Sequence, residues 1–402
     1  MIQNSRPILI LMFLATLGPI ATDIYLPSIP AIASSFNVPL STVQLSIATY
    51  MLGYSIGALF HGTLSDIFGR KPIVLTCLYV AIIGGVICCI SNTISIFLLG
   101  RFIQGFGFSG AVVLSRSIIR DIAPNKIKLI QNASTLGMLN AGVTALAPLL
   151  GGYIQRYTFW QLNFIILIIA PICLSLVCWF KLPETRIYKI RRSVKEIGID
   201  CLEIVTNKKF ILYNMVTTLT LACMIGYQTV STDLLQIKVG LTPDQYGYTA
   251  LIITLFLGLG GLFNSKSIAK YGQKKLYNFG SAIFIFAGFL YLIIGSINFI
   301  NIYSILIPII TLAFASGIMF PNSSSGAMAM FSTKIGTASS IYTFIQMLGV
   351  SIISAIISSI NNPSPLTLGV LFIISGILCT IASILIHNKY INMSNTELMK
   401  EN

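Results

Sequence analysis

Long apolar stretches separated by short polar breaks dominate the hydropathy pattern of this 402-residue chain. A helix needs about 20 mainly apolar residues to cross the hydrocarbon core of a bilayer, and twelve stretches meet this requirement. They begin near Ile8, Thr42, Pro72, Ile94, Leu129, Thr158, Phe210, Gln245, Leu276, Asn301, Thr333 and Leu366. Segments of this length exclude the shorter strands of a membrane barrel. We therefore predict an all-α integral membrane protein with twelve transmembrane helices.

The composition supports the same class and narrows the chemistry. Hydrophobic residues make up 55% of the chain and charged residues only 9%, whereas a soluble domain carries about 25% charged residues. The eight cysteines fall mostly within apolar stretches, and the two histidines, His61 and His387, lie far apart. This spacing suits no metal site. We expect no metal, no cofactor and no enzymatic activity.

The net charge of +14 raises the possibility of an anionic partner such as nucleic acid. The distribution of the basic residues argues against one. If the N-terminus is cytoplasmic, only Arg156 and Lys238 fall on the outer side, while Arg101 and Arg116 lie within the fourth span. This bias toward the cytoplasm is the signal that orients membrane proteins. It predicts a multi-pass protein of a bacterial inner membrane with both termini cytoplasmic, and a lipid bilayer rather than nucleic acid as partner.

A basic segment divides the chain near its middle. Six spans lie within residues 1–180, a cytoplasmic linker covers 181–208, and six spans with a short cytoplasmic tail lie within 209–402. The linker contains either an amphipathic helix near 194–205 or a solvated connector. A weak repeat with an offset of 203 residues places Gly69-Arg70-Lys71 on Gly272-Gln273-Lys274. Carriers that alternate access between two sides of a membrane are built from such repeats, with a site at their interface.

A charged turn joins the second and third spans. It reads G-x-L-x-D-x-x-G-R-K and contains Gly62, Asp66, Gly69, Arg70 and Lys71. Glycine permits close helix packing and a sharp turn, and the opposite charges can pair at a helix end. The pattern resembles the loop between helices 2 and 3 of the major facilitator superfamily. That resemblance implies a secondary transporter.

Asp23 is the strongest candidate for proton coupling. It lies within the first span, flanked by Pro19 and Pro27, which loosen the local backbone. An acid inside a membrane span costs a few kcal/mol and is rarely kept without a role. Burial of the carboxyl group favours its protonated form. When the site becomes accessible from the other side of the membrane, the carboxyl group would release its proton. The alternative is that Asp23 lies near the outer surface and is simply hydrated.

Arg101 is the natural counter-charge to Asp23 within the first six spans. It stands in the pattern R-x-x-Q-G-x-G, with Gln104, Gly105 and Gly107, which matches the helix 4 motif of the superfamily. A guanidinium stays protonated and can bind a carboxylate strongly. The alternative is an arginine at a helix end that extends toward the membrane surface.

The fifth span contains Pro148, Gly151 and Gly152. Proline removes a backbone hydrogen bond and small residues permit close approach of helices, which suits a hinge or a tight seal. The segment resembles the antiporter motif G-P-x-x-G-G, with Ala147 in place of its first glycine.

Together these segments resemble the Bcr/CflA drug-resistance group, most closely over residues 20–185. That resemblance implies a twelve-helix, proton-coupled exporter. By position, it makes Asp23 the proton-coupling carboxylate and Arg101 the residue that links proton and substrate binding. It also implies a cytoplasmic cluster that latches the outward-facing state. The latch and its motif comprise Gly62, Asp66, Gly69, Arg70, Arg120 and Asp121.

The second six spans offer candidates without a motif. Asp233 is either a second intramembrane acid or a residue of the outer mouth beside Lys238. Tyr50, Asn140 and Gln228 could line a substrate cavity, because polar side chains inside membrane helices need partners. The alternative for most of them is a role in holding helices together.

The predicted function is export of drugs or other small amphipathic molecules in exchange for protons, by a monomer. A dedicated exporter of one metabolite or siderophore is an alternative, and an uptake symporter is a less favoured one. A membrane enzyme or a non-transporting sensor is disfavoured, because the sequence offers no cluster of catalytic residues and no phosphate-binding loop.

Overall fold

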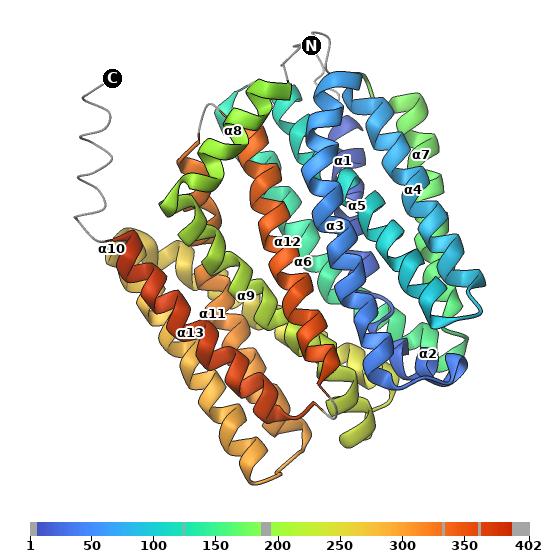
Figure 1. Cartoon of the computed structure of the whole chain (residues 1–402), viewed down its shortest axis with the longest axis vertical. Coiled ribbons are helices and arrows are strands. Elements are labelled where there is room, and N and C mark those ends of the chain that lie inside the picture. The colour runs from blue at the N-terminus through green and yellow to red at the C-terminus, as the bar shows by residue number, and fades with distance from the viewer. Residues whose placement is uncertain (1–5, 124, 186–193, 332–333, 361–362, 388–402) are drawn as a thin grey trace.

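The computed structural model describes residues 6–123, 125–185, 194–331, 334–360 and 363–387, which form a bundle of long helices without a β-strand (Figure 1). The first group of helices precedes residue 186. It comprises α1 (Arg6–Asp23), the short η1 (Leu26–Ser28), α2 (Ile29–Phe36), α3 (Leu40–Phe68), α4 (Arg70–Ile90), α5 (Ile94–Ile122), α6 (Lys126–Tyr157) and α7 (Gln161–Lys181).

The second group of helices follows residue 193. It comprises α8 (Val194–Thr206), α9 (Lys208–Thr232), the π-helical η2 (Asp233–Lys238), α10 (Pro243–Ser296), α11 (Ile302–Ala329), α12 (Ile335–Ser359) and α13 (Pro365–Ile386). The helix α8 occupies the segment for which either an amphipathic helix or a connector was expected. Parts of the expected linker (186–193) and tail (388–402) lie outside the described residues.

Helix α10 accounts for two of the twelve predicted spans. Its 54 residues would extend about 80 Å at 1.5 Å per residue, far beyond the roughly 30 Å of a bilayer core. The helix is interrupted at Gly272, whose φ of 74° and ψ of 163° are not helical. Ten other helical segments of the described residues are long and apolar enough to cross a membrane. With α10 counted as two spans, the fold is an all-α membrane bundle of twelve.

The first span is broken inside the bundle. Helix α1 ends at Asp23, and the chain continues through η1 into α2, which ends at Phe36 and is followed by the left-handed Asn37 (φ 52°). Pro27 stands within η1 and has no N–H to extend a helical ladder. The break leaves carbonyl groups at the end of α1 without helical partners, and Asp23 sits at this point.

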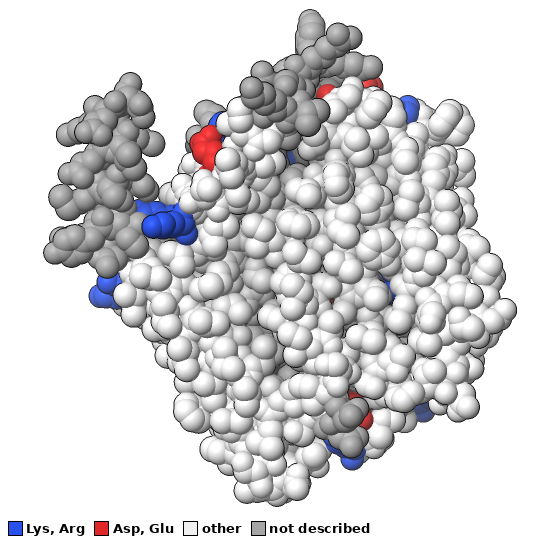
Figure 2. Space-filling view, viewed as in Figure 1, with Lys and Arg blue, Asp and Glu red and all other residues white. Residues whose placement is uncertain are grey.

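The helix ends lie on two faces of the molecule. Helix α1 begins on the same face as the turn between α3 and α4, and this face is called the terminal face below (Figure 1). The opposite face carries η1, α2 and the start of α10, and is called the distal face. Figure 2 shows charged side chains gathered toward the two ends, with an almost uncharged band between them. This is the surface expected of a protein that spans a bilayer.

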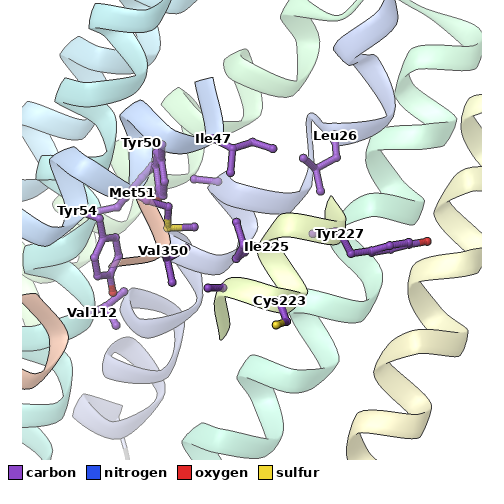
Figure 3. Packing of buried hydrophobic residues seen from close by; sticks show 14 of the residues in the cluster. Leu26, Ile47, Tyr50, Met51, Tyr54, Val112, Cys223, Ile225, Tyr227 and Val350 are labelled. Carbon is purple, nitrogen blue, oxygen red and sulfur yellow. The ribbon is translucent and has the colours of Figure 1, made fainter. Parts of the chain in front are cut away.

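The two groups of helices meet along two main seams. Helix α3 packs against α12, and α6 packs against α10. Buried apolar residues join the groups where they meet, and Figure 3 shows Met51 of α3, Ile225 of α9 and Val350 of α12 in one cluster. The candidate site lies between these seams.

Candidate functional site

A cavity of about 490 Å³ lies between the two groups of helices. It is within the usual range for small-molecule sites, roughly 300–1,000 Å³. Helices from both groups line it, and its polar wall is small. The polar lining residues are Thr22, Asp23, Tyr50, Tyr54, Thr144, Thr220, Gln228, Thr254 and Ser316. Three methionines, Met51, Met224 and Met347, contribute flexible apolar surface.

Asp23 is the one acid among the described residues that line this cavity. Its exposed fraction is only 3%. The side-chain amide of Gln228 in α9 donates to the Asp23 carboxylate, with 3.4 Å between Nε2 and Oδ1. This contact joins the first group of helices to the second. The alternative that Asp23 is a hydrated surface residue therefore does not fit its position.

Arg101 does not pair with Asp23, contrary to expectation. The Arg101 side chain is fully buried in α5. Its Nη2 donates to the carbonyl oxygen of Ala21 at 3.1 Å, and its Nη1 donates to Gln104. Its guanidinium lies over the rings of Tyr25 and Tyr50, 4.3 and 4.4 Å from their centroids. No ion pair links Arg101 to an acid among the described residues.

The physical reason lies in the break of α1. The Ala21 carbonyl is near the C-terminus of α1, where carbonyl groups lack helical partners and the helix dipole favours a cation. Arg101 supplies this cation, and the aromatic rings replace part of its hydration. Arg101 therefore positions the end of α1, and with it Asp23, without binding the carboxylate directly.

The two groups of helices are in close contact on the distal side of the cavity. A Cβ atom at Gly151 would collide with the carbonyl oxygen of Ile24, and one at Gly152 would collide with that of Pro243. Pro148 and Leu149 pack in turn against Gly247. The glycines of the predicted antiporter motif thus allow α6 to seal against the break of α1 and the start of α10.

An ion pair completes this seal. Arg156 at the end of α6 contacts Asp244 at the start of α10, with 2.5 Å between Nη1 and Oδ2. The hydroxyl of Thr242 also donates to Asp244, at 2.6 Å. The ion pair of Arg156 and Asp244, called the distal gate below, joins residues 88 positions apart. Sequence analysis noted Arg156 only as an outer basic residue and did not single out Asp244.

Nearer the terminal face, glycines of α6 and α10 border open space. A Cβ atom at Gly137 or Gly142 of α6, or at Gly258 of α10, would meet no atom within 4 Å. Gly258 lines the cavity. The two helices are therefore in close contact at the distal gate, whereas these glycines nearer the terminal face border open space.

The predicted charged turn forms a compact cluster at the terminal face. Gly69 has a φ of 105°, which only glycine adopts readily. Arg70 is 2% exposed and binds Asp66 at 2.9 Å and Asp121 at 3.0 Å. Asp66, Arg70 and Asp121 are called the terminal charge cluster below. On α3, a Cβ atom at Gly62 would lie 2.6 Å from the Ser340 hydroxyl of α12.

Glu184 belongs to this neighbourhood and escaped sequence analysis. Its carboxylate accepts hydrogen bonds from the backbone N–H of Arg70 at 2.9 Å and from that of Lys71 at 3.1 Å. It thus caps the N-terminus of α4, where the helix dipole favours an anion. Glu184 lies in a basic stretch more than 110 positions after the start of α4. No rule based on local spacing could therefore have paired Glu184 with this helix end.

Three further candidates can now be placed, and for Asp233 the structure agrees with the alternative of an outer-mouth residue beside Lys238. Arg120 forms no ion pair among the described residues, and its guanidinium lies near Gly336 of α12. Asn140 is not among the residues that line the cavity. Asp233 pairs with Lys238 at 2.9 Å, and Lys238 also donates to the Pro363 carbonyl. Asp233 is therefore a residue of the distal mouth, whereas Tyr50 and Gln228 do line the cavity.

Metal-ligating side chains do not gather in the described part of the chain. No group of three or more His, Cys, Asp or Glu residues there could hold a metal ion. Of these four types, the described lining of the cavity contributes Asp23 alone.

The comparison with known families agrees with this architecture. Residues 11–354 match the model of the Major Facilitator Superfamily. The chain belongs to this family. Members of the superfamily are transporters, and the chain is accordingly a multi-pass membrane transporter rather than an enzyme.

Several curated relatives span nearly the whole chain. The bicyclomycin resistance protein homolog of Haemophilus influenzae is 25% identical over 92% of this chain and 94% of its own length. The multidrug resistance protein D of Escherichia coli is 25% identical over 94% of both chains. The multidrug resistance protein MdtL of Citrobacter koseri is 28% identical over 84% of this chain and 85% of its own.

Solved structures of other transporters share the fold. A D-xylose-proton symporter superposes with a TM-score of 0.76 at 16% identity, over 95% of this chain and 96% of its own. A mutant form of the nucleoside transporter NupG superposes with a TM-score of 0.71 at 14% identity, over 96% of this chain and 100% of its own. At these identities the similarity concerns the fold.

Proposed function

We propose that this protein exports drugs or other small amphipathic molecules across a bacterial inner membrane in exchange for protons. The observation that carries the proposal is a buried carboxylate, Asp23, in the wall of a drug-sized cavity between two groups of helices. The printed names of the relatives from Haemophilus, Escherichia and Citrobacter, which refer to drug resistance, support the same direction.

The cavity suits substrates of varied shape. Flexible methionines are typical of surfaces that bind several ligands, and three line this cavity beside Tyr54 and Phe320. The polar groups near Asp23 would orient a substrate, while most of its contacts would be apolar. A single chain supplies every wall, so a monomer suffices.

The described conformation corresponds to an inward-facing carrier in this proposal. The terminal face is cytoplasmic, as the basic residues of the sequence indicate, with both termini on that side. Residues 1–180 and 209–402 move as two halves joined by the linker 181–208. Substrate enters from the terminal side while the distal gate is shut, and a proton leaves Asp23 to the same side.

The reverse movement completes the cycle. The terminal charge cluster of Asp66, Arg70 and Asp121, with Arg120 nearby, would help to hold the outward-facing state. There a proton binds Asp23 as substrate leaves. Exchange requires that proton and substrate favour different conformational states of the protein. A ligand that binds both states with equal affinity does not shift the equilibrium between them.

Proton release in everted membrane vesicles tests the proposal. Vesicles that contain the protein are acidified inside by respiration, and compounds such as ethidium are added. Exchange predicts that a transported compound dissipates the proton gradient in these vesicles and not in vesicles without the protein. If no member of a broad drug panel does so, drug export in exchange for protons is wrong for this protein.

A further inference from the structure

A second, smaller chamber lies beside the main cavity, and it is called the distal chamber below. Its volume is about 70 Å³. Asp23, Gln228 and Thr144 line both spaces, as do Met224 and Thr254. Pro148 of α6 and the α10 residues Tyr246, Thr249 and Ala250 close the chamber on the side of the distal gate. Asp23 therefore stands in a wall between two compartments.

Two residues that line the chamber carry buried polar atoms that lack partners in the described part of the chain. Tyr227 lines it and is 3% exposed, and its hydroxyl has no hydrogen-bond partner among the described residues. The Oε1 atom of Gln228 is likewise buried and unpartnered there, whereas its Nε2 donates to Asp23. In Figure 3, Tyr227 extends away from Met51 and Ile225, toward the side of α10. Buried polar groups are rarely left without a protein or water partner.

Size and polarity together identify the occupant. A buried water needs a space of roughly 10–15 Å³ for its centre and two to four polar partners, and the chamber offers several times this space. The Tyr227 hydroxyl can donate to a water, while Gln228 Oε1 and the Asp23 carboxylate can accept from one. A substrate of drug size does not fit, because the chamber is far smaller than the main cavity.

We propose that the distal chamber holds ordered water that contacts Asp23 from the side opposite the substrate cavity. The role of this water in proton delivery rests on the proposed function. When the distal gate opens, a hydronium ion in the chamber gives its proton to an Asp23 oxygen; an O–H bond breaks in the ion, one forms on the carboxyl group, and a water remains. The proton then reaches Asp23 without first displacing substrate from the main cavity.

Hydroxyl-radical footprinting of the purified full-length protein in nanodiscs tests the chamber without any substrate. X-rays generate radicals from bound water, and mass spectrometry locates the oxidised side chains. We expect Tyr227 to be oxidised several-fold faster than Tyr291. Tyr291 is the matched control because it is also buried, but its hydroxyl donates to the Ile305 carbonyl and it lines neither space.

A variant that fills the chamber provides the second arm. Ala250→Leu places a larger side chain in its wall and is expected to lower oxidation of Tyr227 to the level of Tyr291. Met224 also lines the main cavity, so its oxidation should persist and report an intact fold. If Ala250→Leu does not fold, Ala250→Val gives the same comparison with a smaller change.

Two results would overturn the inference: equal oxidation of Tyr227 and Tyr291 in the wild type, or unchanged oxidation of Tyr227 in the filled variant. Either result would refute the water-filled chamber even if everted vesicles show proton exchange. Conversely, strong oxidation of Tyr227 without proton exchange in vesicles would support the chamber and refute the proposed coupling.

Discussion

The amide of Gln228 in α9 contacts the carboxylate of Asp23 in α1, with 3.4 Å between Nε2 and Oδ1. The two residues are 205 positions apart and belong to the two groups of helices. A hydrogen bond to a carboxylate is stronger than one between neutral groups. Protonation of Asp23 therefore weakens a contact that joins the two groups. This links the charge of one residue to the arrangement of the whole bundle.

Replacement of Arg101 should destabilise the protein even when the new residue is lysine. Arg101→Lys removes the planar group that lies over Tyr25 and Tyr50 and also contacts the Ala21 carbonyl. We expect a loss of roughly 2 kcal/mol of stability, because a desolvated cation–π contact is worth about that much. Thermal unfolding in detergent measures the loss. Arg116→Lys, at an exposed position of the same helix, is the control and should unfold like the wild type.

Glu184 should stabilise the start of α4. Glu184→Ala removes the acceptor of two backbone hydrogen bonds, from Arg70 and Lys71. Loss of a side-chain cap costs about 1 kcal/mol. We expect a lower unfolding temperature for Glu184→Ala and a smaller decrease for Glu184→Gln, which keeps one acceptor oxygen. Equal unfolding temperatures for Glu184→Ala and the wild type would show that the cap is not required.

The distal gate should open during transport. Cysteines that replace Arg156 and Asp244, in a background without the eight native cysteines, should cross-link readily with a short bifunctional maleimide. Cross-linking holds α6 against α10 and should abolish transport of ethidium, whereas each single cysteine variant should keep it. Transport that continues after complete cross-linking would mean that this gate does not move.

Helix α8 should stay attached to the start of α12 over a wide pH range. Hydrogen bonds to Asp200 and then to Glu203 raise the pKa of Lys334 above its ordinary value of 10.5. Because this pKa is raised, the contact contributes fully below about pH 10.5 and is lost as the pH rises through the higher value. The distance between spin labels on α8 and α12 should therefore be constant from pH 7 to pH 9.

High salt and substitution of Lys334 provide a second test of the ion pairs between α8 and Lys334. Lys334 is partly exposed, so high salt should weaken its ion pairs. Lys334→Gln should broaden the spin-label distance between α8 and α12 at neutral pH, while Lys334→Arg should not. A broad distance in the wild type at pH 7 and low salt would contradict the role of these ion pairs.

Sequence analysis predicted the fold well, because the requirement for about 20 apolar residues acts on each span separately. The twelve starting points came from this rule, including those near Gln245 and Leu276, between which the structure interrupts α10 at Gly272. The charged turn was predictable for a related reason. Asp66, Gly69 and Arg70 lie within one short segment, so their contact is set by local geometry.

Contacts between distant segments were not predictable in this way. Charge alone suggested that Arg101 would bind Asp23, but the broken end of α1 provides a carbonyl of Ala21 that competes for the guanidinium. Gln228 was noted as a polar residue and could not be paired with Asp23 from a single sequence. Asp244 and Glu184 were missed because each acts through a partner far away in the chain.

The central claim is that Asp23 couples proton movement to substrate movement, and proteoliposomes test it most directly. Two assays are compared: accumulation of ethidium driven by a proton gradient, and exchange of labelled for unlabelled ethidium without a gradient. Asp233→Asn is the matched control, because Asp233 pairs with Lys238 outside the cavity. We expect Asp23→Asn to lose gradient-driven accumulation and keep exchange, while Asp233→Asn keeps both. Gradient-driven accumulation by Asp23→Asn at the wild-type rate would contradict the account.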